Sequence, residues 1–518
     1  MNHSVYAYNL GLKFYSISEE FSSNIALKFP SDVSYSYREI NAQSNRIAGI
    51  LLEASVKKGD VVAIFNNKSC NAYCTMLACL KIGAIYTNLD TSSPIQRLHK
   101  ILDRCQPKII CFDAVDDTFK DNILDVIKVD FTFDILSEQF ATELNKYSEH
   151  NLDHTLLVTS SDPAYIMFTS GSTGFPKGAV MSHGNVLNFI NWGSQTFQVS
   201  EKDIFTNANP IYFDNSVFDF YVSLFNGATL VPLSHDLVKS TKKLVDAINE
   251  SNCTIWFSVP SLLVYLLTTR ALTKNDFKSV TRISFGGEGF PKNKLQQLFH
   301  LFGDRITLFN VYGPTECTCI CSSYIITEKD FENMNELAPL GHIASNFSFE
   351  ILPQKAENQS LGELALLGPC VGLGYYNDVE RTATSFIQNS KSSFTQVMYK
   401  TGDLVELGAN GYLYFKGRID NQVKHMGYRI ELEEIEAAFS TLKYIDEVGV
   451  IYEKISAELG QIKAFISIAA PQIDEQTILS DIKNLLPPYM IPRKIVILPI
   501  LPKNSNGKID RKQLALVK

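Results

Sequence analysis

The chain alternates short apolar runs with amphipathic stretches from residue 34 to about residue 230. Residues 61–65 and 108–112 are β-branched and aromatic runs that predict buried strands, whereas 39–52 and 96–102 place apolar residues at helical spacing. Alternating strands and helices are typical of parallel sheets covered by helices. The pattern therefore predicts an α/β fold.

The same alternation continues through the next part of the chain. Residues 254–259, 282–285 and 307–311 predict short strands that lead into loops. In α/β sheets, ligands bind at the carboxyl ends of the strands, so we expect a binding site at these loops.

The pattern changes at residues 399–418, where glycines and charges lie close together. Beyond it, 431–439 and 478–486 predict amphipathic helices and 448–452 and 462–468 predict strands, which together form a compact α+β unit. Residues 502–514 predict a polar loop followed by a short helical turn. We therefore expect a large domain over 1–419 and a small domain over 420–518.

Length predicts a multi-domain enzyme or a large domain with an appendage, and composition agrees with a folded globular protein. The chain has 518 residues, of which 45% are hydrophobic and 20% charged. A net charge of -8 argues against a nucleic-acid partner. No secretory signal and no apolar run of membrane-spanning length is visible, so we expect a cytoplasmic protein that does not insert into a membrane.

The ten cysteines form no CxxC pair, which predicts reduced, mostly buried thiols. Cys317, Cys319 and Cys321 alternate, and on a strand all three would share one face. Their spacing is not that of a metal site.

Residues 165–180, YIMFTSGSTGFPKGAV, place a glycine- and hydroxyl-rich loop after an apolar strand. Glycines let backbone N–H groups approach an anion, and hydroxyls and a lysine add donors and charge, so the loop suits a polyphosphate. It is not a Walker A loop, because Pro176 precedes Lys177 and Gly178 follows it. A glycine-rich surface turn is the alternative for this segment alone.

Further motifs accompany this loop in a fixed order. They are SYSYREIN (34–41), LKIGAIYTNLD (80–90), FDNS (213–216), NVYGPTE (310–316), GELAL (362–366), YKTGDL (399–404), GRIDNQVKHMGYRIE (417–431) and NGKIDR (506–511). Together they make the chain resemble the adenylate-forming superfamily of acyl-CoA synthetases, luciferases and adenylation domains. The resemblance is nearest to the freestanding amino-acid adenylation enzymes of nonribosomal peptide synthetases and to the D-alanine:carrier-protein ligases. It implies a distorted β-barrel portion in the large domain and a mobile small domain.

The resemblance implies ATP and Mg²⁺ as cofactors. Glu316 matches the residue near Mg²⁺, which prefers hard carboxylate oxygens. Thr315 matches an α-phosphate donor, and Asp403 and Arg418 match ribose or phosphate contacts. The implied ATP- and AMP-binding residues are Thr169, Ser170, Gly171, Ser172, Thr173, Gly174, Lys177, Gly286, Gly287, Glu288, Asn310, Val311, Tyr312, Gly313, Asp403 and Arg418.

Three residues are implied to be catalytic: Lys508, Thr315 and Glu316. Lys508 matches the mobile lysine that bridges the attacking carboxylate and the α-phosphate, where a cation stabilises developing charge. Asp420 matches the hinge of the small domain, which would present Lys508 for adenylation and then Lys424 to Gly427 for thioester formation. A solvated lysine and a turn cap are the simpler alternatives for Lys508 and Asp420.

Asp214 matches the residue that pairs with the α-ammonium of an amino acid, and a carboxylate there discriminates against fatty acids. Capping of the following helix is the alternative. The implied substrate-binding residues are Asp214, Asn215, Phe218, Ile283, Phe285, Val311, Cys319, Ile320 and Lys508. Their bulk suggests a compact amino acid such as proline, alanine, serine or valine, although Asn215 could bind a polar group.

The chain ends ten residues after Lys508, so we expect a freestanding enzyme or excised domain that delivers its product to the phosphopantetheine arm of a carrier protein in trans. Three alternatives stay open: a D-alanine:carrier-protein ligase, an acyl- or aryl-CoA ligase, and an inactive scaffold. Asp214 argues against the CoA ligase. Retention of Lys177, Glu316, Asp403 and Lys508 together argues against the scaffold.

Overall fold

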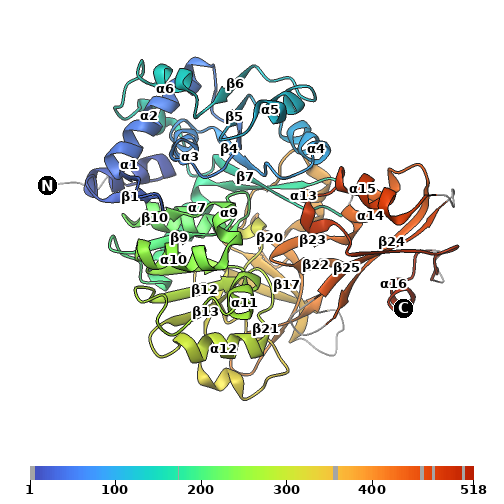
Figure 1. The fold of residues 1–518 in the computed structure, drawn as a ribbon. Helices are drawn as coiled ribbons and strands as arrows, with labels where there is room; N and C mark the ends of the chain where they lie inside the picture. The colour runs from blue at the N-terminus through green and yellow to red at the C-terminus, as the bar shows by residue number, and fades with distance from the viewer. Residues whose placement is uncertain are drawn as a thin grey trace.

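Two parallel-rich sheets and an antiparallel sheet form the large domain of this computed structural model, and a smaller α+β unit packs against one side of it (Figure 1). The structure describes residues 6–172, 174–353, 360–455, 460–468, 473–504 and 508–517. No helix in these ranges is both long and apolar enough to cross a membrane.

The first sheet has the strand order β18-β8-β7-β4-β3-β5-β6. Its central strands are parallel, whereas β8 is antiparallel to both β7 and β18. Its strands are β3 (Val61–Phe65), β4 (Ile85–Leu89), β5 (Ile109–Phe112), β6 (Phe131–Asp134), β7 (Pro163–Thr169), β8 (Lys177–Ser182) and β18 (Gly374–Tyr375). The loop between β7 and β8 is the glycine-rich segment.

The second sheet has the order β15-β14-β13-β12-β11-β9-β10-β1-β2 and is parallel from β13 to β1. Its strands are β1 (Ile25–Lys28), β2 (Ser34–Ser36), β9 (Ile204–Asn207), β10 (Thr229–Pro232), β11 (Ile255–Ser258), β12 (Arg282–Gly286), β13 (Thr307–Tyr312), β14 (Ser322–Ile325) and β15 (His342–Ile343).

The third sheet is antiparallel, with the strand order β16-β17-β20-β19 and with β21 paired to β20. Its strands are β16 (Ser348–Pro353), β17 (Leu361–Leu367), β19 (Phe386–Gln388), β20 (Val397–Leu407) and β21 (Leu413–Arg418).

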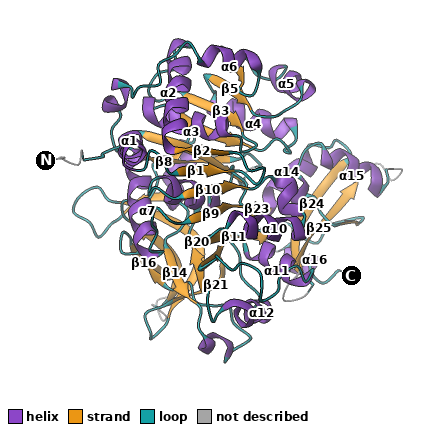
Figure 2. Cartoon of the chain, turned by 60° about the vertical axis from the view of Figure 1, so that its left-hand side comes forward, coloured by secondary structure: helices purple, strands orange, loops and turns teal. Residues whose placement is uncertain are grey.

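Helices cover the sheets of the large domain (Figure 2). They are α1 (Leu10–Glu20), α2 (Tyr37–Glu53), α3 (Cys70–Ile82), α4 (Ile95–Cys105), α5 (Asp117–Leu124), α6 (Glu138–Leu144), α7 (His183–Thr196), α8 (Asn215–Val217), α9 (His235–Lys239), α10 (Thr241–Ser251), α11 (Pro260–Thr268), α12 (Lys292–Phe302) and α13 (Val379–Ser385). Short 3-10 or π turns are η1 (Asp153–Leu157), η2 (Phe218–Val222), η3 (Thr315–Cys317) and η4 (Glu328–Phe331).

The small domain contains a hairpin, a three-stranded sheet and helices. These are β22 (Gln422–His425), β23 (Tyr428–Glu431), β24 (Ile445–Lys454), β25 (Gly460–Ile468), β26 (Lys494–Ile497), α14 (Leu432–Ser440), α15 (Glu475–Lys483) and α16 (Arg511–Leu514), with the turn η5 (Pro488–Met490). They enclose an apolar core of their own, in which Ile435 and Phe439 of α14 pack with Ala464 and Ile466 of β25.

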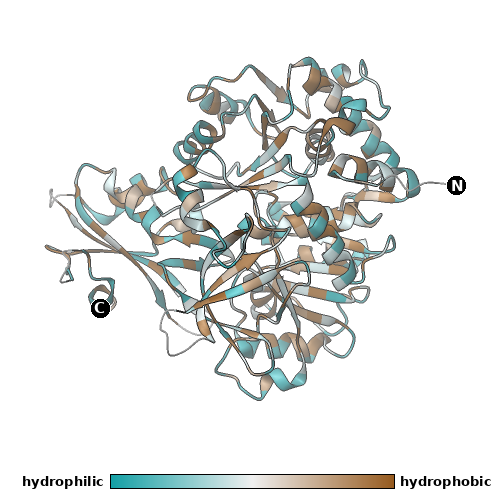
Figure 3. Cartoon of the chain, turned by 180° about the vertical axis from the view of Figure 1, so that it is seen from behind, coloured by the Kyte–Doolittle hydropathy of each residue, from teal (hydrophilic) through white to brown (hydrophobic). Residues whose placement is uncertain are grey.

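Local sequence explains where several elements begin and end. The side chain of Ser36 accepts a hydrogen bond from the Glu39 N–H and that of Glu39 accepts one from the Ser36 N–H, a capping box that starts α2. Gly83 ends α3 with φ 73°, a conformation that glycine adopts at little cost. The hydropathy of the chain shows a separate pattern. Apolar positions, drawn brown, gather inside the molecule, and polar positions, drawn teal, lie mostly outside (Figure 3).

The prediction of an α/β large domain with a small α+β domain is confirmed. The predicted boundary at 419/420 stays a prediction, with β21 and β22 on its two sides in different sheets. The three alternating cysteines precede a strand and do not lie on one. Cys317 ends the turn η3, and Cys319 has φ 74°, so the chain turns here before β14 begins at Ser322.

Candidate functional site

A cavity of about 350 Å³ lies between the large domain and the β22–β23 hairpin of the small domain. Both domains line it. The predicted site residues on its wall are Thr169, Ser170, Asp214, Asn215, Gly287, Gly313, Thr315, Asp403, Arg418, Lys424 and Gly427. The structure thus brings together residues from widely separated segments of the chain.

The glycine-rich loop connects antiparallel strands in which Thr169 pairs with Lys177. A Cβ on Gly171 would lie 2.0 Å from the Phe175 carbonyl oxygen, so this position requires glycine. The Ser170 hydroxyl and the Gly171 N–H both bond to small-domain groups. Ser172 and Gly174 belong to the same loop, and the predicted Thr173 lies outside the described residues.

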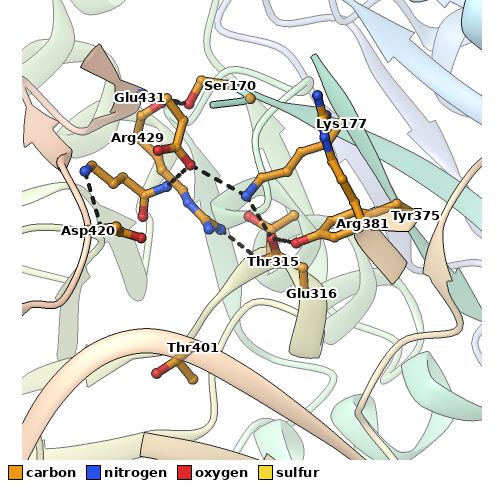
Figure 4. Close-up of polar contacts among 12 residues, drawn as sticks. Ser170, Lys177, Thr315, Glu316, Tyr375, Arg381, Thr401, Asp420, Arg429 and Glu431 are labelled. Carbon is orange, nitrogen blue, oxygen red and sulfur yellow. Dashed lines mark hydrogen bonds and ion pairs between the residues drawn. The ribbon is translucent and has the colours of Figure 1, made fainter. Parts of the chain in front are cut away.

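Glu316 is fully buried on η3, and three donors surround its carboxylate (Figure 4). Arg429 Nη1 lies 2.7 Å from Oε2, and the Tyr375 hydroxyl donates to Oε1 at 2.7 Å. Lys177 Nζ lies 3.6 Å from Oε1. Burial opposes ionisation, but Arg429 and Lys177 hold the pKa of Glu316 well below its usual value, so it is a carboxylate.

This arrangement bears on the predicted metal site. A carboxylate is a suitable Mg²⁺ ligand. Both oxygens of Glu316 are already engaged by Arg429, Tyr375 and Lys177. The residue type therefore fits a divalent cation, whereas the present position of Arg429 does not leave the carboxylate free to bind one.

Asp403 lies at another part of the cavity wall, on β20. Its carboxylate accepts hydrogen bonds from the Tyr312 hydroxyl and from Arg418 Nη1, both at 2.6 Å. Arg418 also binds Asp420, at 2.6 Å, and these acids raise the pKa of Arg418 despite its burial. The predicted hinge residue Asp420 thus adjoins the predicted ribose-binding pair.

Asn310 and Val311 lie on β13 with Tyr312, and all three are buried outside the cavity wall. The Asn310 side chain donates to the Pro339 carbonyl at 2.7 Å. Gly286 and Glu288 likewise do not line the cavity. Glu288 instead accepts the Ser261 N–H at 2.7 Å and the Gly427 N–H at 2.9 Å, which ties the hairpin to the start of α11.

Asp214 lies at the cavity wall, where its Oδ2 accepts the Thr315 hydroxyl at 2.6 Å. It makes no side-chain capping bond to α8, so the capping alternative is wrong. Burial raises the pKa of Asp214, and the Thr315 hydrogen bond partly opposes this rise. Asn215 follows it on the same wall.

Six further predicted specificity residues are buried and do not line the cavity. Phe218 contacts Phe257 with ring centroids 5.3 Å apart, and Phe285 contacts Phe290 at 4.8 Å. The buried set is Phe218, Ile283, Phe285, Val311, Cys319 and Ile320.

The hairpin places Lys424 and Gly427 against the large domain. Lys424 Nζ lies 5.6 Å from the centre of the Tyr312 ring, and burial lowers its pKa. Met426 and Gly427 form the turn, with φ 53° and 82°. A Cβ on Gly427 would lie 2.7 Å from the Val259 side chain, so only glycine allows this approach.

Lys508 is exposed and does not line the cavity. Its N–H donates to the Asn504 side chain at 3.1 Å, in the C-terminal segment at the outer edge of the small domain (Figure 1). Asn506 and Gly507 of the same motif lie outside the described residues. The structure therefore unites the predicted thioester-forming segment with the site and leaves the predicted adenylating lysine outside it.

Sequence reasoning missed Arg429 and Tyr375 as site residues. Arg429 lies within the motif at 417–431, and its place in that charged motif was the available signal. Tyr375 carried no comparable signal, because it reaches Glu316 from β18.

Residues 15–376 match the family model described as AMP-binding enzyme, and residues 434–508 match the AMP-binding enzyme C-terminal domain. The chain belongs to the AMP-binding enzyme family. The predicted membership of the adenylate-forming superfamily, and with it the ligase class, is thereby confirmed.

Relatives of this AMP-binding enzyme include a D-alanine--D-alanyl carrier protein ligase from Listeria monocytogenes, 32% identical over 494 residues, which cover 92% of this chain and 93% of the relative. The ligase of the same name from Lacticaseibacillus rhamnosus is 30% identical over 509 residues, 96% of this chain and 97% of the relative. An artificially fused adenylation–PCP di-domain from Klebsiella oxytoca is 22% identical with a TM-score of 0.80, covering 95% of this chain and 94% of that one.

Proposed function

We propose that this AMP-binding enzyme uses ATP and Mg²⁺ to activate a small amino acid, with a side chain no larger than a methyl group, and passes it to the phosphopantetheine thiol of a carrier protein. D-Alanine is the first candidate. The relatives named D-alanine--D-alanyl carrier protein ligase support both the amino acid and the acceptor.

The observation that carries the proposal is the environment of Asp214. Its carboxylate lies at the cavity wall beside Thr315 and caps no helix. A carboxylate in this position can pair with an α-ammonium, and a fatty or aryl acid would leave it unpaired. Phe218, Phe285 and Cys319 are buried and do not line the cavity, and in this proposal they would limit the space for the substrate side chain.

The phosphate loop, Thr315, Asp403 and Arg418 would hold the nucleotide in this proposal. Glu316 would hold Mg²⁺ once Arg429 is withdrawn. Lys508 would then stabilise charge between carboxylate and phosphate. Rotation near Asp420 would replace Lys508 by the hairpin, whose Lys424 and Gly427 meet the large domain in this structure.

The experiment is amino-acid-dependent ATP–pyrophosphate exchange with glycine, D- and L-alanine, D- and L-serine, L-valine, L-proline, β-alanine, and fatty and aryl acids. Exchange with alanine that is lost in Asp214→Asn supports the proposal. Exchange only with an acid that lacks an amino group would overturn it in favour of a CoA ligase. Silence with every acid would favour a scaffold.

A second variant tests the size limit. Cys319 is buried near Asp214 and has φ 74°, a conformation that glycine adopts without strain. Cys319→Gly should open the pocket and raise the exchange ratio of serine or valine to alanine by about tenfold, the effect of roughly one methylene group. An unchanged ratio would place the specificity elsewhere.

A further inference from the structure

A buried ion pair connects the two domains next to the phosphate loop. Arg97 on α4 places its Nε 3.2 Å from Oε1 of Glu434 on α14. The side chains are only 9% and 4% exposed. Burial of a charged pair is costly unless its remaining donors and acceptors are satisfied, so the other oxygen of Glu434 needs a partner.

That partner belongs to the phosphate loop. The Gly171 N–H donates to Glu434 Oε2 at 3.0 Å. Glu434 therefore uses one oxygen for Arg97 and the other for a backbone donor of the kind that holds an anion in glycine-rich loops. The chemistry of adenylation and transfer set out above does not use this carboxylate.

Other groups of the loop are occupied by the same part of the small domain (Figure 4). The Ser170 hydroxyl donates to the Arg429 carbonyl at 2.8 Å and accepts the Glu431 N–H at 3.1 Å. Lys177 Nζ lies 3.5 Å from Glu431 Oε1. These donors, predicted to hold phosphate oxygens, are thus engaged by protein oxygens.

The fit of α14 onto the loop is also steric. A Cβ on Gly174 would lie 2.5 Å from the Ala437 Cβ, so the helix rests directly on the loop. A phosphate group bound to the same donors would stand next to the carboxylates of Glu431 and Glu434. The negative charges of the phosphate and of these carboxylates would repel each other. The Gly171 N–H also cannot donate a full hydrogen bond to the phosphate and to Glu434 at once.

We propose that Glu434 is a positioning residue whose carboxylate occupies an anion position of the phosphate loop and, oriented by Arg97, holds the small domain in the arrangement seen here. Pyrophosphate and Glu434 then compete for the loop. Since the coupling between two such events is reciprocal, each weakens the other by the same factor. The inference rests on the proposed two-step function.

The first measurement separates the two reaction steps. Glu434→Ala should slow transfer of the aminoacyl group from preformed adenylate to the carrier thiol by about tenfold, the effect of one lost contact of about 1.4 kcal/mol, with a much smaller change in pyrophosphate exchange. Glu433→Gln is the matched control, because Glu433 lies on the same helix and contacts Arg511 within the small domain. Arg97→Met should act like Glu434→Ala, and the double variant should be no slower.

The second measurement follows the position of the small domain on the large domain directly. Dyes introduced without thiol chemistry at Leu157 and Ile500, which are 68% and 77% exposed, report the distance between domains by energy transfer. The protein carries the stable alanyl sulfamoyl adenosine analogue, and inorganic pyrophosphate is added. Pyrophosphate should unseat the domain at about tenfold lower concentration in Glu434→Ala than in Glu433→Gln, as the reciprocal coupling requires.

Equal transfer rates and equal pyrophosphate midpoints in the two variants would overturn the inference. If Glu434→Ala does not fold, Glu434→Gln keeps the side-chain volume and removes the charge, and the same comparison applies. Failure of the proposed function gives a different result, because none of the amino acids tested would then support pyrophosphate exchange by the unmodified protein. In that case the distance measurement with pyrophosphate alone still decides whether phosphate and Glu434 compete.

Discussion

The β22–β23 hairpin and the C-terminal segment around Lys508 belong to the same small domain but lie in opposite environments. The hairpin packs against the large domain, where the Gly427 N–H donates to Glu288 and Arg429 donates to Glu316. Lys508 is exposed and away from the cavity. A rigid unit can present only one of these segments at a time, which favours a division of labour between two positions of the domain.

The largest effect should come from the exposed segment. Lys508→Ala should lower pyrophosphate exchange by about 10²–10³-fold, the usual loss when one group that stabilises transition-state charge is removed. Transfer from preformed aminoacyl adenylate should lose far less. Single-turnover measurements of the two steps check this, and an equal loss in both would contradict the division between segments.

The reciprocal variant lies in the hairpin. Gly427→Ala adds a Cβ only 2.7 Å from Val259 at a residue with φ 82°, so the hairpin cannot seat as it does here. Transfer to the carrier thiol should fall by about 10- to 100-fold, or roughly 1.4–2.7 kcal/mol of barrier. The larger loss should fall on transfer rather than on exchange. Gly417→Ala is the control, because nothing lies within 4 Å of its Cβ although its φ is also positive.

Asp214 should make the affinity for the amino acid depend on pH. This effect acts at substrate binding, before the small domain moves. Burial raises its pKa, and only the ionised form can pair with an ammonium group. Amino-acid affinity is therefore fully present above that raised pKa and is lost as the pH falls through it, by about tenfold per pH unit below it. The half-saturating amino-acid concentration in exchange, measured from about pH 8 to about pH 5, checks this. A half-saturating concentration that stays constant over this range would contradict the pairing of Asp214 with the ammonium group.

The smallest effect concerns how the exposed segment is anchored. Arg511 binds Glu436 at 2.8 Å and Glu433 at 3.2 Å, which fixes α16 against α14 just after Lys508. Arg511→Ala should reduce exchange by a factor of about three and the free energy of unfolding by less than about 1 kcal/mol, since the pair is partly exposed. Exchange assays and denaturant titration measure these changes. A loss as large as that of Lys508→Ala would mean that Arg511 itself enters the site.

The sequence pattern predicted most elements because they obey simple periodicities. The strand over 61–65 is observed at the same bounds as β3, and the helix predicted over 39–52 is observed as α2. The hairpin was not predicted as two strands, because 422–431 is polar and contains a glycine turn. Its strands are stabilised by contact with the other domain, which no local pattern reveals.

The sequence motifs predicted individual residues of the site but not the contacts between them. Asp214, Thr315, Asp403 and Arg418 were named in advance and share one cavity wall. The bond from Arg429 to Glu316 spans 113 residues, and that from Arg97 to Glu434 spans 337. Such pairings depend on how the two domains meet, and a motif gives the residue but not its partner.

The contacts between domains have a consequence for the separated form of the protein. Most of those described above join charged or polar groups, among them Arg97 with Glu434 and Arg429 with Glu316, and the ring contact of Phe213 with Tyr428 is an exception. When the domains part, the ionised groups of these pairs are rehydrated, whereas Phe213 loses its ring contacts with Tyr428 and Tyr489. Opening thus exchanges ion pairs for hydrated charges and gives up a small group of ring contacts.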